Sequence, residues 1–257
     1  MAQSINHNQV IETTLLRGKV KLLQPKTGFH ASLDTVFLAA GVGVMKDRQN
    51  ILDVGCGVGS AGLCVLARIP QQVHLTGIDV QPELTDLALQ NATLNGWQDR
   101  CRFFHGNILN EKSIADNSFH VVIMNPPYQE GGRHTPSPLK NKAFSRGEEA
   151  SGATLEQWVK YAHKKLKNGG ELVMVHRADR VDDILRVLTQ RRWFGSVVVY
   201  PLYSYAGEDA KRVVIGARKE RYAPASLRSG LVIHEKGGAY TKEAEAILSN
   251  AASLPLF

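Results

Sequence analysis

The chain contains 257 residues, of which 43% are hydrophobic and 21% charged, as expected of a globular protein with a substantial core. It has no apolar run long enough to span a membrane, and its first ten residues lack the blocks of a secretion signal, so we expect a cytoplasmic protein without a membrane partner. Its three cysteines show no C-x-x-C spacing, and this pattern suggests neither a disulfide framework nor a metal site. The net charge of +7 favours a polyanionic partner such as nucleic acid, although an ordinary solvated surface can be equally basic.

The first fifty residues predict a hairpin followed by a helix. Residues 13–24 contain two β-rich stretches around Arg17-Gly18-Lys19, which is typical of a short hairpin. Ser32 can cap a helix through residues 33–44, where apolar side chains recur on one face. From residue 50 the pattern becomes a strand, a glycine-rich loop and a helix, over residues 50–68.

The rest of the chain continues to alternate between strands and helices. Strands are expected over residues 73–80, 101–109, 119–125, 171–176, 196–203 and 212–219, and helices over residues 82–96, 155–167 and 179–191. This alternation predicts an α/β fold with a doubly wound, mainly parallel sheet. No helical pattern separates the last two strands, so we expect them to be antiparallel. The tail from Tyr222 adds a short apolar stretch, LVIH, and a helix over residues 242–251, as an extension of the same domain.

A glycine-rich loop follows the strand that ends near Asp53. Gly57, Gly59 and Gly62 match the G-x-G-x-x-G pattern, and Asp79 ends the next strand 20 residues after Gly59. This is the spacing of a dinucleotide-binding fingerprint, in which the glycines let the backbone approach the ligand and the acid binds a ribose diol. NAD and S-adenosylmethionine both carry an adenosine, so the spacing alone fits either cofactor.

Asp53 favours S-adenosylmethionine. Its carboxylate faces the turn at which NAD would place a pyrophosphate and would repel it, whereas S-adenosylmethionine presents an ammonium and a sulfonium. The run from Asp53 to Gly59 resembles motif I of the class I S-adenosylmethionine-dependent methyltransferases, which have a seven-stranded Rossmann-like sheet. The resemblance implies that the cofactor contacts Asp53, Gly55, Gly57, Gly59, Asp79, Val80, Asn107 and Ile108. The family commonly has an acid where Asn107 stands.

The strand over residues 119–125 ends in Asn125-Pro126-Pro127-Tyr128. Ligands of doubly wound sheets bind outside the carboxyl ends of the strands, so we expect Asn125 beside the cofactor. An amino group conjugated to a ring or a carbonyl is a weak nucleophile because its lone pair is delocalised. The Asn125 side-chain oxygen and the Pro126 carbonyl can accept its two N–H bonds and favour a pyramidal nitrogen. The proline rings hold that carbonyl in place, and Tyr128 offers a flat face on which a planar group can stack.

The N-P-P-Y motif resembles the signature of methyltransferases that act on adenine N6 or on a glutamine amide. From about Leu15 to Lys219, the chain is similar to the bacterial tRNA (adenine-N6)-methyltransferases, which modify the adenine next to the anticodon of a valine tRNA. The similarity includes the hairpin, Asp34 in SLDTVFLAA, the glycine loop, N-P-P-Y and AKRVVIGARK. It implies that residues 1–46 cover the cofactor, with Asp34 and Asn125 among its contacts. Residues 47–221 would form the catalytic domain, and residues 222–257 its extension.

The segment after Tyr128 is a candidate RNA-binding loop. It is rich in glycine, proline and basic side chains and almost without apolar residues, and it is long for a loop in a compact domain. Four of its basic residues can neutralise phosphates beside an adenine that has swung out of its stack. These residues are Arg133, Lys140, Lys142 and Arg146. The partner implied by the resemblance is tRNA.

Several alternatives remain open from the sequence. Glutamine-amide methyltransferases of translation release factors share the N-P-P-Y motif but carry a helical substrate domain before motif I, and only about fifty residues precede Asp53 here. Methyltransferases of ribosomal RNA guanine typically have Phe where Tyr128 stands. An NAD-dependent oxidoreductase and a catalytically inactive RNA-binding protein are further alternatives. The exact tRNA and the oligomeric state cannot be inferred from the sequence.

Overall fold

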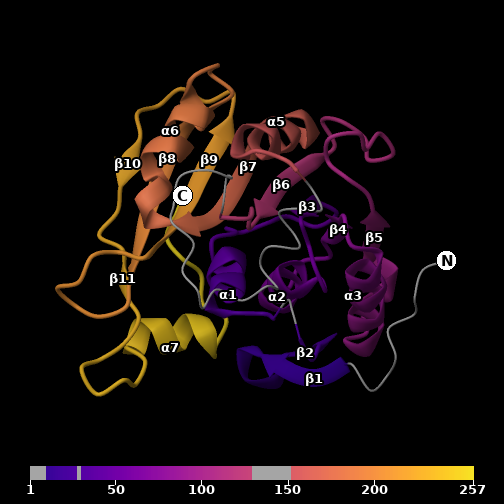
Figure 1. The fold of residues 1–257 in the computed structure, drawn as a ribbon, viewed down its shortest axis with the longest axis horizontal. Coiled ribbons are helices and arrows are strands. Elements are labelled where there is room, and N and C mark those ends of the chain that lie inside the picture. The colour runs from indigo at the N-terminus through magenta and orange to yellow at the C-terminus, as the bar shows by residue number, and fades with distance from the viewer. Residues whose placement is uncertain (1–9, 28–29, 129–151) are drawn as a thin grey trace.

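The protein folds around one twisted sheet that is covered by helices on both faces (Figure 1). The structure is a computed structural model and describes residues 10–27, 30–128 and 152–257. Within these ranges, nine strands form the sheet in the order β10-β8-β9-β7-β6-β3-β4-β5, with β11 paired to β8. A separate antiparallel hairpin of β1 and β2 lies near the amino terminus.

The elements have the following bounds. The strands are β1 (Val10–Leu15), β2 (Val20–Pro25), β3 (Asn50–Val54), β4 (His74–Asp79), β5 (Cys101–His105), β6 (Phe119–Met124), β7 (Leu166–Arg177), β8 (Phe194–Tyr203), β9 (Arg212–Lys219), β10 (Ser226–Leu227) and β11 (Leu231–Val232). The helices are α1 (Leu33–Ala40), α2 (Ser60–Arg68), α3 (Pro82–Leu94), α5 (Leu155–Lys165), α6 (Val181–Thr189) and α7 (Lys242–Leu248).

The strand directions place several strand ends at one edge of the sheet. Strands β5, β4, β3, β6 and β7 are parallel, β9 is antiparallel to β7, and β8 is antiparallel to β9. The carboxyl ends of β3, β4, β5 and β6 therefore meet at one edge, which we call the carboxyl edge. Arg212 pairs with Arg177 in the sheet, so the amino end of β9 reaches the same edge.

The predicted doubly wound, mainly parallel sheet with antiparallel last strands is confirmed, but its strand count was wrong. The seven strands from β3 to β9 are those expected, and β10 and β11 add two residues each by pairing in parallel with β8. Both come from the tail after Tyr222. Such short pairings depend on the neighbouring strand, so a local sequence pattern does not reveal them.

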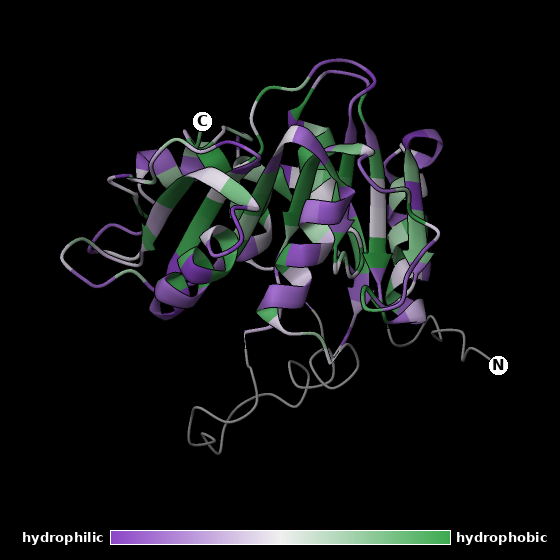
Figure 2. Ribbon diagram, turned by 90° about the horizontal axis from the view of Figure 1, so that it is seen from above, coloured by the Kyte–Doolittle hydropathy of each residue, from purple (hydrophilic) through white to green (hydrophobic). Residues whose placement is uncertain are grey.

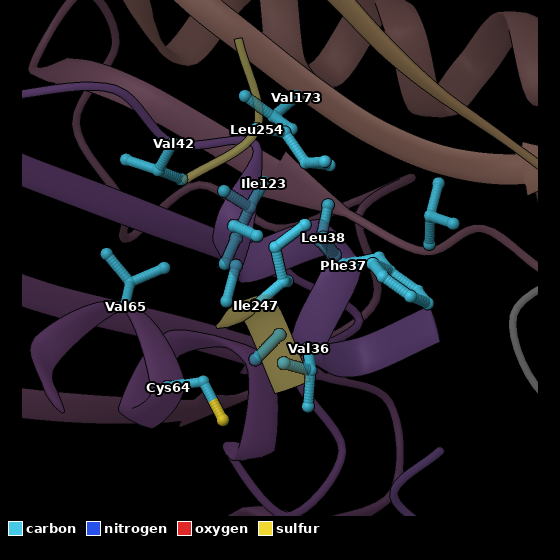
Figure 3. Packing of buried hydrophobic residues seen from close by; sticks show 14 of the residues in the cluster. Val36, Phe37, Leu38, Val42, Cys64, Val65, Ile123, Val173, Ile247 and Leu254 are labelled. Carbon is cyan, nitrogen blue, oxygen red and sulfur yellow. The ribbon is translucent and has the colours of Figure 1, made fainter. Parts of the chain in front are cut away.

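Two hydrophobic clusters fill the space between the sheet and its helices. Successive residues of β3 alternate between them, because side chains of a strand point to opposite faces: Ile51 joins one cluster and Leu52 the other. Helices α1, α2 and α7 cover the first face, where Phe37, Ile123 and Ile247 pack together (Figure 3). Helices α5 and α6 cover the second face. Figure 2 shows the resulting pattern, with hydrophobic strands inside and hydrophilic residues on the outer helices.

Helix α5 ends two residues earlier than the sequence predicted. Its expected end was at Lys167, whereas the helix stops at Lys165 and β7 begins at Leu166. Leu166 is fully buried and pairs with Phe119 of β6, so its place in the sheet overrides the local helical pattern. Helix α6 is likewise shorter than expected, because residues 178–180 form a 3-10 turn before it.

Candidate active site at the carboxyl edge of the sheet

The glycine loop lies where β3 turns into α2. Gly55, Gly57 and Gly59 all have positive φ angles, of 70°, 53° and 80°, which side chains other than glycine rarely adopt. The backbone N–H groups of Gly55 and Cys56 donate to the Ile78 carbonyl at 2.8 and 3.0 Å, and these bonds tie the loop to β4. The loop therefore presents backbone rather than side chains to a ligand at this edge.

Asp79 is fastened directly to the glycine loop. Its Oδ2 accepts a hydrogen bond from the Gly57 N–H at 2.9 Å, and its Oδ1 accepts one from the Gln81 N–H at 3.0 Å. Burial raises the pKa of Asp79, against the lowering effect of these N–H donors. A carboxylate has about four lone-pair sites, so Asp79 can still accept hydrogen bonds from a ribose diol. This position agrees with the predicted ribose contact.

Asp53 is buried beneath the loop and connects β3 to α2. Its Oδ2 accepts a hydrogen bond from the Gly62 N–H at 3.0 Å, in the first turn of α2. The pKa of Asp53 is raised to about 7, mainly by burial and partly by the neighbouring Asp79, against the lowering effect of the Gly62 N–H. A cationic ligand would favour ionised Asp53, whereas a pyrophosphate would oppose it. The buried Asp53 carboxyl therefore fits a cofactor with positive charge.

The turn after β5 is held by Asn107. Its Oδ1 accepts a hydrogen bond from the Leu109 N–H at 3.0 Å, so the amide shapes this turn. Ile108 is partly buried and packs against the cluster under α5 and α6. Val80, directly after β4, is also partly exposed. All three residues lie at the carboxyl edge, as the predicted adenosine contacts require.

The segment Asn125-Pro126-Pro127-Tyr128 begins where β6 ends, next to the glycine loop. Met124 pairs with Val54, the last residue of β3, which places Asn125 beside Gly55 across the two strands. Pro126 is buried, while Asn125 and Tyr128 are partly exposed. The Tyr128 hydroxyl lies 2.9 Å from Asn125 Oδ1, so the two side chains are within hydrogen-bond distance of each other.

The ring of Tyr128 is enclosed by residues from two other strands. The Arg212 guanidinium lies over the ring at 5.1 Å from its centroid, and His176 packs edge-on at a centroid distance of 5.1 Å. Burial lowers the pKa of His176 to about 4, so the imidazole is neutral near pH 7. A planar substrate must therefore use the uncovered part of the Tyr128 ring or displace Arg212.

Asp34 contacts the tyrosine of the motif. Its Oδ2 lies 3.1 Å from the Tyr128 hydroxyl and accepts a hydrogen bond from Arg212 Nε at 3.0 Å. The sequence predicts a cofactor contact for Asp34 and no role in the site for Arg212 or His176. The sequence signals for Arg212 were its place beside Lys211 in a basic cluster and in the segment AKRVVIGARK. His176 Nδ1 is buried without a partner among the described residues, as is Trp158 Nε1.

Parts of the predicted site lie outside the described residues. These are the four basic residues of the loop after Tyr128, namely Arg133, Lys140, Lys142 and Arg146. In the described ranges no group of His, Cys, Asp and Glu side chains could hold a metal ion. None of the helices in those ranges is long and apolar enough to cross a membrane.

The comparisons with known proteins identify the family of this chain. The model of the methyltransferase small domain family matches residues 34–193, which is more than half of the chain. The chain belongs to this family. The matched segment includes Asp34, the glycine loop, Asp79 and the N-P-P-Y motif.

This methyltransferase has relatives of similar length. A Yersinia enterocolitica protein named tRNA1(Val) (adenine(37)-N6)-methyltransferase is 25% identical, with 84% of this chain and 83% of the relative covered. A protein of the same name from Porphyromonas gingivalis is 26% identical, with 76% of each chain covered. These relatives bear out the predicted resemblance.

A solved structure confirms the fold. The crystal structure of a predicted O-methyltransferase from Agrobacterium tumefaciens has a TM-score of 0.70 and 26% sequence identity, with 86% of this chain and 98% of that chain covered. The fold is therefore that of the class I methyltransferases, and the cofactor is S-adenosylmethionine, as the sequence predicted. The NAD-dependent alternative is not supported.

Proposed function

We propose that this methyltransferase transfers the methyl group of S-adenosylmethionine to the exocyclic N6 amine of an adenine in tRNA. The adenine next to the anticodon of a valine tRNA is the proposed target, in keeping with the names of the relatives. The observation that carries the proposal is the place of Asn125-Pro126-Pro127-Tyr128 beside the glycine loop, at the end of β6. The net charge of +7 supports a polyanionic substrate.

The chemistry requires two acceptors for one amine. S-adenosylmethionine supplies an electrophilic methyl group bonded to a sulfonium. The Asn125 side-chain oxygen and the Pro126 carbonyl accept the two N–H bonds of the amine and direct its lone pair outward. As the N–C bond forms, the S–C bond breaks and its electron pair stays on sulfur. The amine then carries a positive charge and releases a proton to solvent, so no strong base is needed.

The cofactor site is proposed to use the residues around the glycine loop. Asp79 would hold the ribose, and Asp53 would face the cationic methionine end. Gly57 and Gly59 would allow close approach of the backbone, and Asn107 with Ile108 would lie beside the adenine. The Cβ sides of Gly55 and Gly59 face protein side chains, Trp158 and Phe103 respectively, so these two glycines also serve packing.

The proposed substrate is tested by transfer of labelled methyl to RNA. The protein is incubated with radioactive S-adenosylmethionine and an unmodified valine tRNA transcript, which is then digested to nucleosides. We expect label in N6-methyladenosine, and no label with a matched transcript in which guanosine replaces the adenosine next to the anticodon. Label that appears only in a release factor, or only in ribosomal RNA, would contradict the proposal. The Asn125→Ala variant serves as the background control.

A further inference from the structure

The Tyr128 hydroxyl has two acceptor oxygens nearby but only one hydrogen to donate. The hydroxyl lies within hydrogen-bond distance of two oxygens, Asn125 Oδ1 at 2.9 Å and Asp34 Oδ2 at 3.1 Å. A protonated phenol has a single hydrogen and can donate it fully to one of these acceptors. Burial and the nearby Asp34 carboxylate raise the pKa of Tyr128, so the phenol remains protonated near pH 7. The acceptor oxygen that receives no hydrogen then faces a lone pair of the Tyr128 hydroxyl oxygen, which repels it.

Asp34 is the better acceptor for this hydrogen. A carboxylate accepts a stronger hydrogen bond than a neutral amide oxygen. The Asp34 side chain is 18% exposed and is held in place by Arg212, whose Nε lies 3.0 Å from Asp34 Oδ2. The guanidinium also lies over the Tyr128 ring and fixes the ring in front of the carboxylate. The hydroxyl therefore donates to Asp34 and leaves its lone pairs toward Asn125.

Rotation of the Asn125 amide group by 180° about its Cβ–Cγ bond removes this repulsion. The rotation exchanges Oδ1 and Nδ2, so that Nδ2 donates to the Tyr128 hydroxyl oxygen. Oδ1 then turns away from Tyr128 and becomes available to another donor. Each side chain from Arg212 through Asp34 and Tyr128 to Asn125 then has a partner of the opposite kind, which stabilises this partly buried hydrogen-bond network.

We propose that Asp34 and Arg212 are positioning residues, which act through the Tyr128 hydroxyl to hold the Asn125 amide with its oxygen toward the substrate amine. This inference rests on the proposed function, because that function assigns the amine to Asn125 Oδ1. It gives Asp34 a different role from the cofactor contact that the resemblance implied. Helix α1 thus contributes to the site through Asp34, which accepts a hydrogen bond from Tyr128, 94 residues later in the chain.

The proposal is tested by a double-mutant cycle between Asp34 and Tyr128. Tyr128→Phe keeps the ring and removes the hydroxyl, so we expect kcat to fall at least tenfold while KM for tRNA and Kd for S-adenosylmethionine stay within threefold. Asp34→Ala should lower kcat to a similar extent in the wild-type background and by less than twofold in the Tyr128→Phe background. Asp34→Asn, which keeps an acceptor oxygen, should recover part of the loss. Fully multiplicative losses would overturn the inference.

A second measurement distinguishes positioning from cofactor binding and needs no substrate. In the cofactor-bound protein with 15N-labelled asparagine, the side-chain amide signals of Asn125 are identified by their loss in Asn125→Ala. We expect Tyr128→Phe and Asp34→Asn each to shift these signals. Unchanged signals, or a Kd for S-adenosylmethionine that rises more than tenfold in Asp34→Asn with kcat preserved, would overturn the inference.

The two measurements also separate this inference from the proposed function. If wild-type protein transfers no methyl to tRNA but the Asn125 signals shift as expected, the substrate is wrong and the positioning chain is retained. If tRNA is methylated and the Asn125 signals do not respond, the positioning chain is wrong and the proposed function is retained. Arg212→Lys is a further variant if Asp34→Ala does not fold, and we expect it to lower kcat without raising Kd for the cofactor.

Discussion

The indole of Trp158 occupies the space in which a side chain on Gly55 would have to stand. A Cβ built on Gly55 would lie 2.6 Å from Cη2 of Trp158, and the φ angle of Gly55 is +70°. The two residues come from β3's end and from α5, so this contact joins the glycine loop to the helix layer. Gly55 thus serves packing and backbone geometry together.

Gly55→Ala is therefore expected to destabilise the fold. The left-handed backbone and the overlap with Trp158 should together lower the free energy of unfolding by about 2–4 kcal/mol. Chemical denaturation followed by circular dichroism measures the change. Gly96→Ala is the matched control, because Gly96 has a φ angle of +73° and open space on its Cβ side. Equal stability of the two variants would show that the contact contributes nothing.

The Asp53 carboxyl is expected to make stability depend on pH. Its pKa is about 7 in the folded protein and 3.8 in its ordinary state, so the folded protein holds the proton more tightly. The contribution of this group is therefore fully present below about pH 4 and is lost as pH rises through 7, by on the order of 4 kcal/mol in total. The difference in unfolding free energy between the cofactor-free wild-type and Asp53→Asn proteins, measured from pH 5 to 8, should follow this curve. A difference that is constant across that range would contradict it.

Cofactor affinity should show the opposite pH dependence. A cationic cofactor selects ionised Asp53, and that form becomes scarce below pH 7. Isothermal titration calorimetry should show a Kd for S-adenosylmethionine that rises by up to about tenfold for each pH unit below 7. Asp53→Asn should bind more weakly and lose this dependence between pH 5.5 and 7.5. A wild-type affinity that is flat over this interval would count against the assigned position of the methionine end.

Asp79→Ala is expected to weaken cofactor binding for two reasons. It removes the proposed ribose acceptor, and it also releases the Gly57 N–H that fixes the glycine loop. We expect Kd for S-adenosylmethionine to rise at least tenfold, measured by calorimetry. Asp79→Asn keeps one acceptor oxygen for the Gly57 N–H and should show a smaller rise. Wild-type affinity for S-adenosylmethionine in both variants would show that Asp79 does not bind the cofactor.

The predictable part of this structure is the part encoded in local patterns. The alternation of Ile51 and Leu52 between two hydrophobic clusters follows from strand geometry, and the sequence showed it as an apolar strand. The positive φ angles of Gly57 and Gly59 agree with the fingerprint spacing. The glycine loop, the acid at Asp79 and the succession of strands along the chain could therefore be predicted.

The unpredicted part depends on contacts between distant segments. Asp34 meets Tyr128 only because α1 packs on the sheet beside β6, and Arg212 reaches both only because β9 is antiparallel to β7. The end of α5 was wrong because Leu166 enters the sheet. The register between two strands cannot be read from one segment at a time, although the antiparallel direction of the last two strands was predicted.

The central claim is that Asn125 activates the substrate amine, whereas its contact with the cofactor contributes little to cofactor affinity. The most direct test measures methyl transfer to the tRNA transcript and the Kd for S-adenosylmethionine in wild-type and Asn125→Ala proteins. We expect transfer to fall by about 100-fold or more, as for the loss of one preorganised transition-state contact. Kd should change by less than about tenfold, or about 1.4 kcal/mol. Undiminished turnover in Asn125→Ala would contradict the claim.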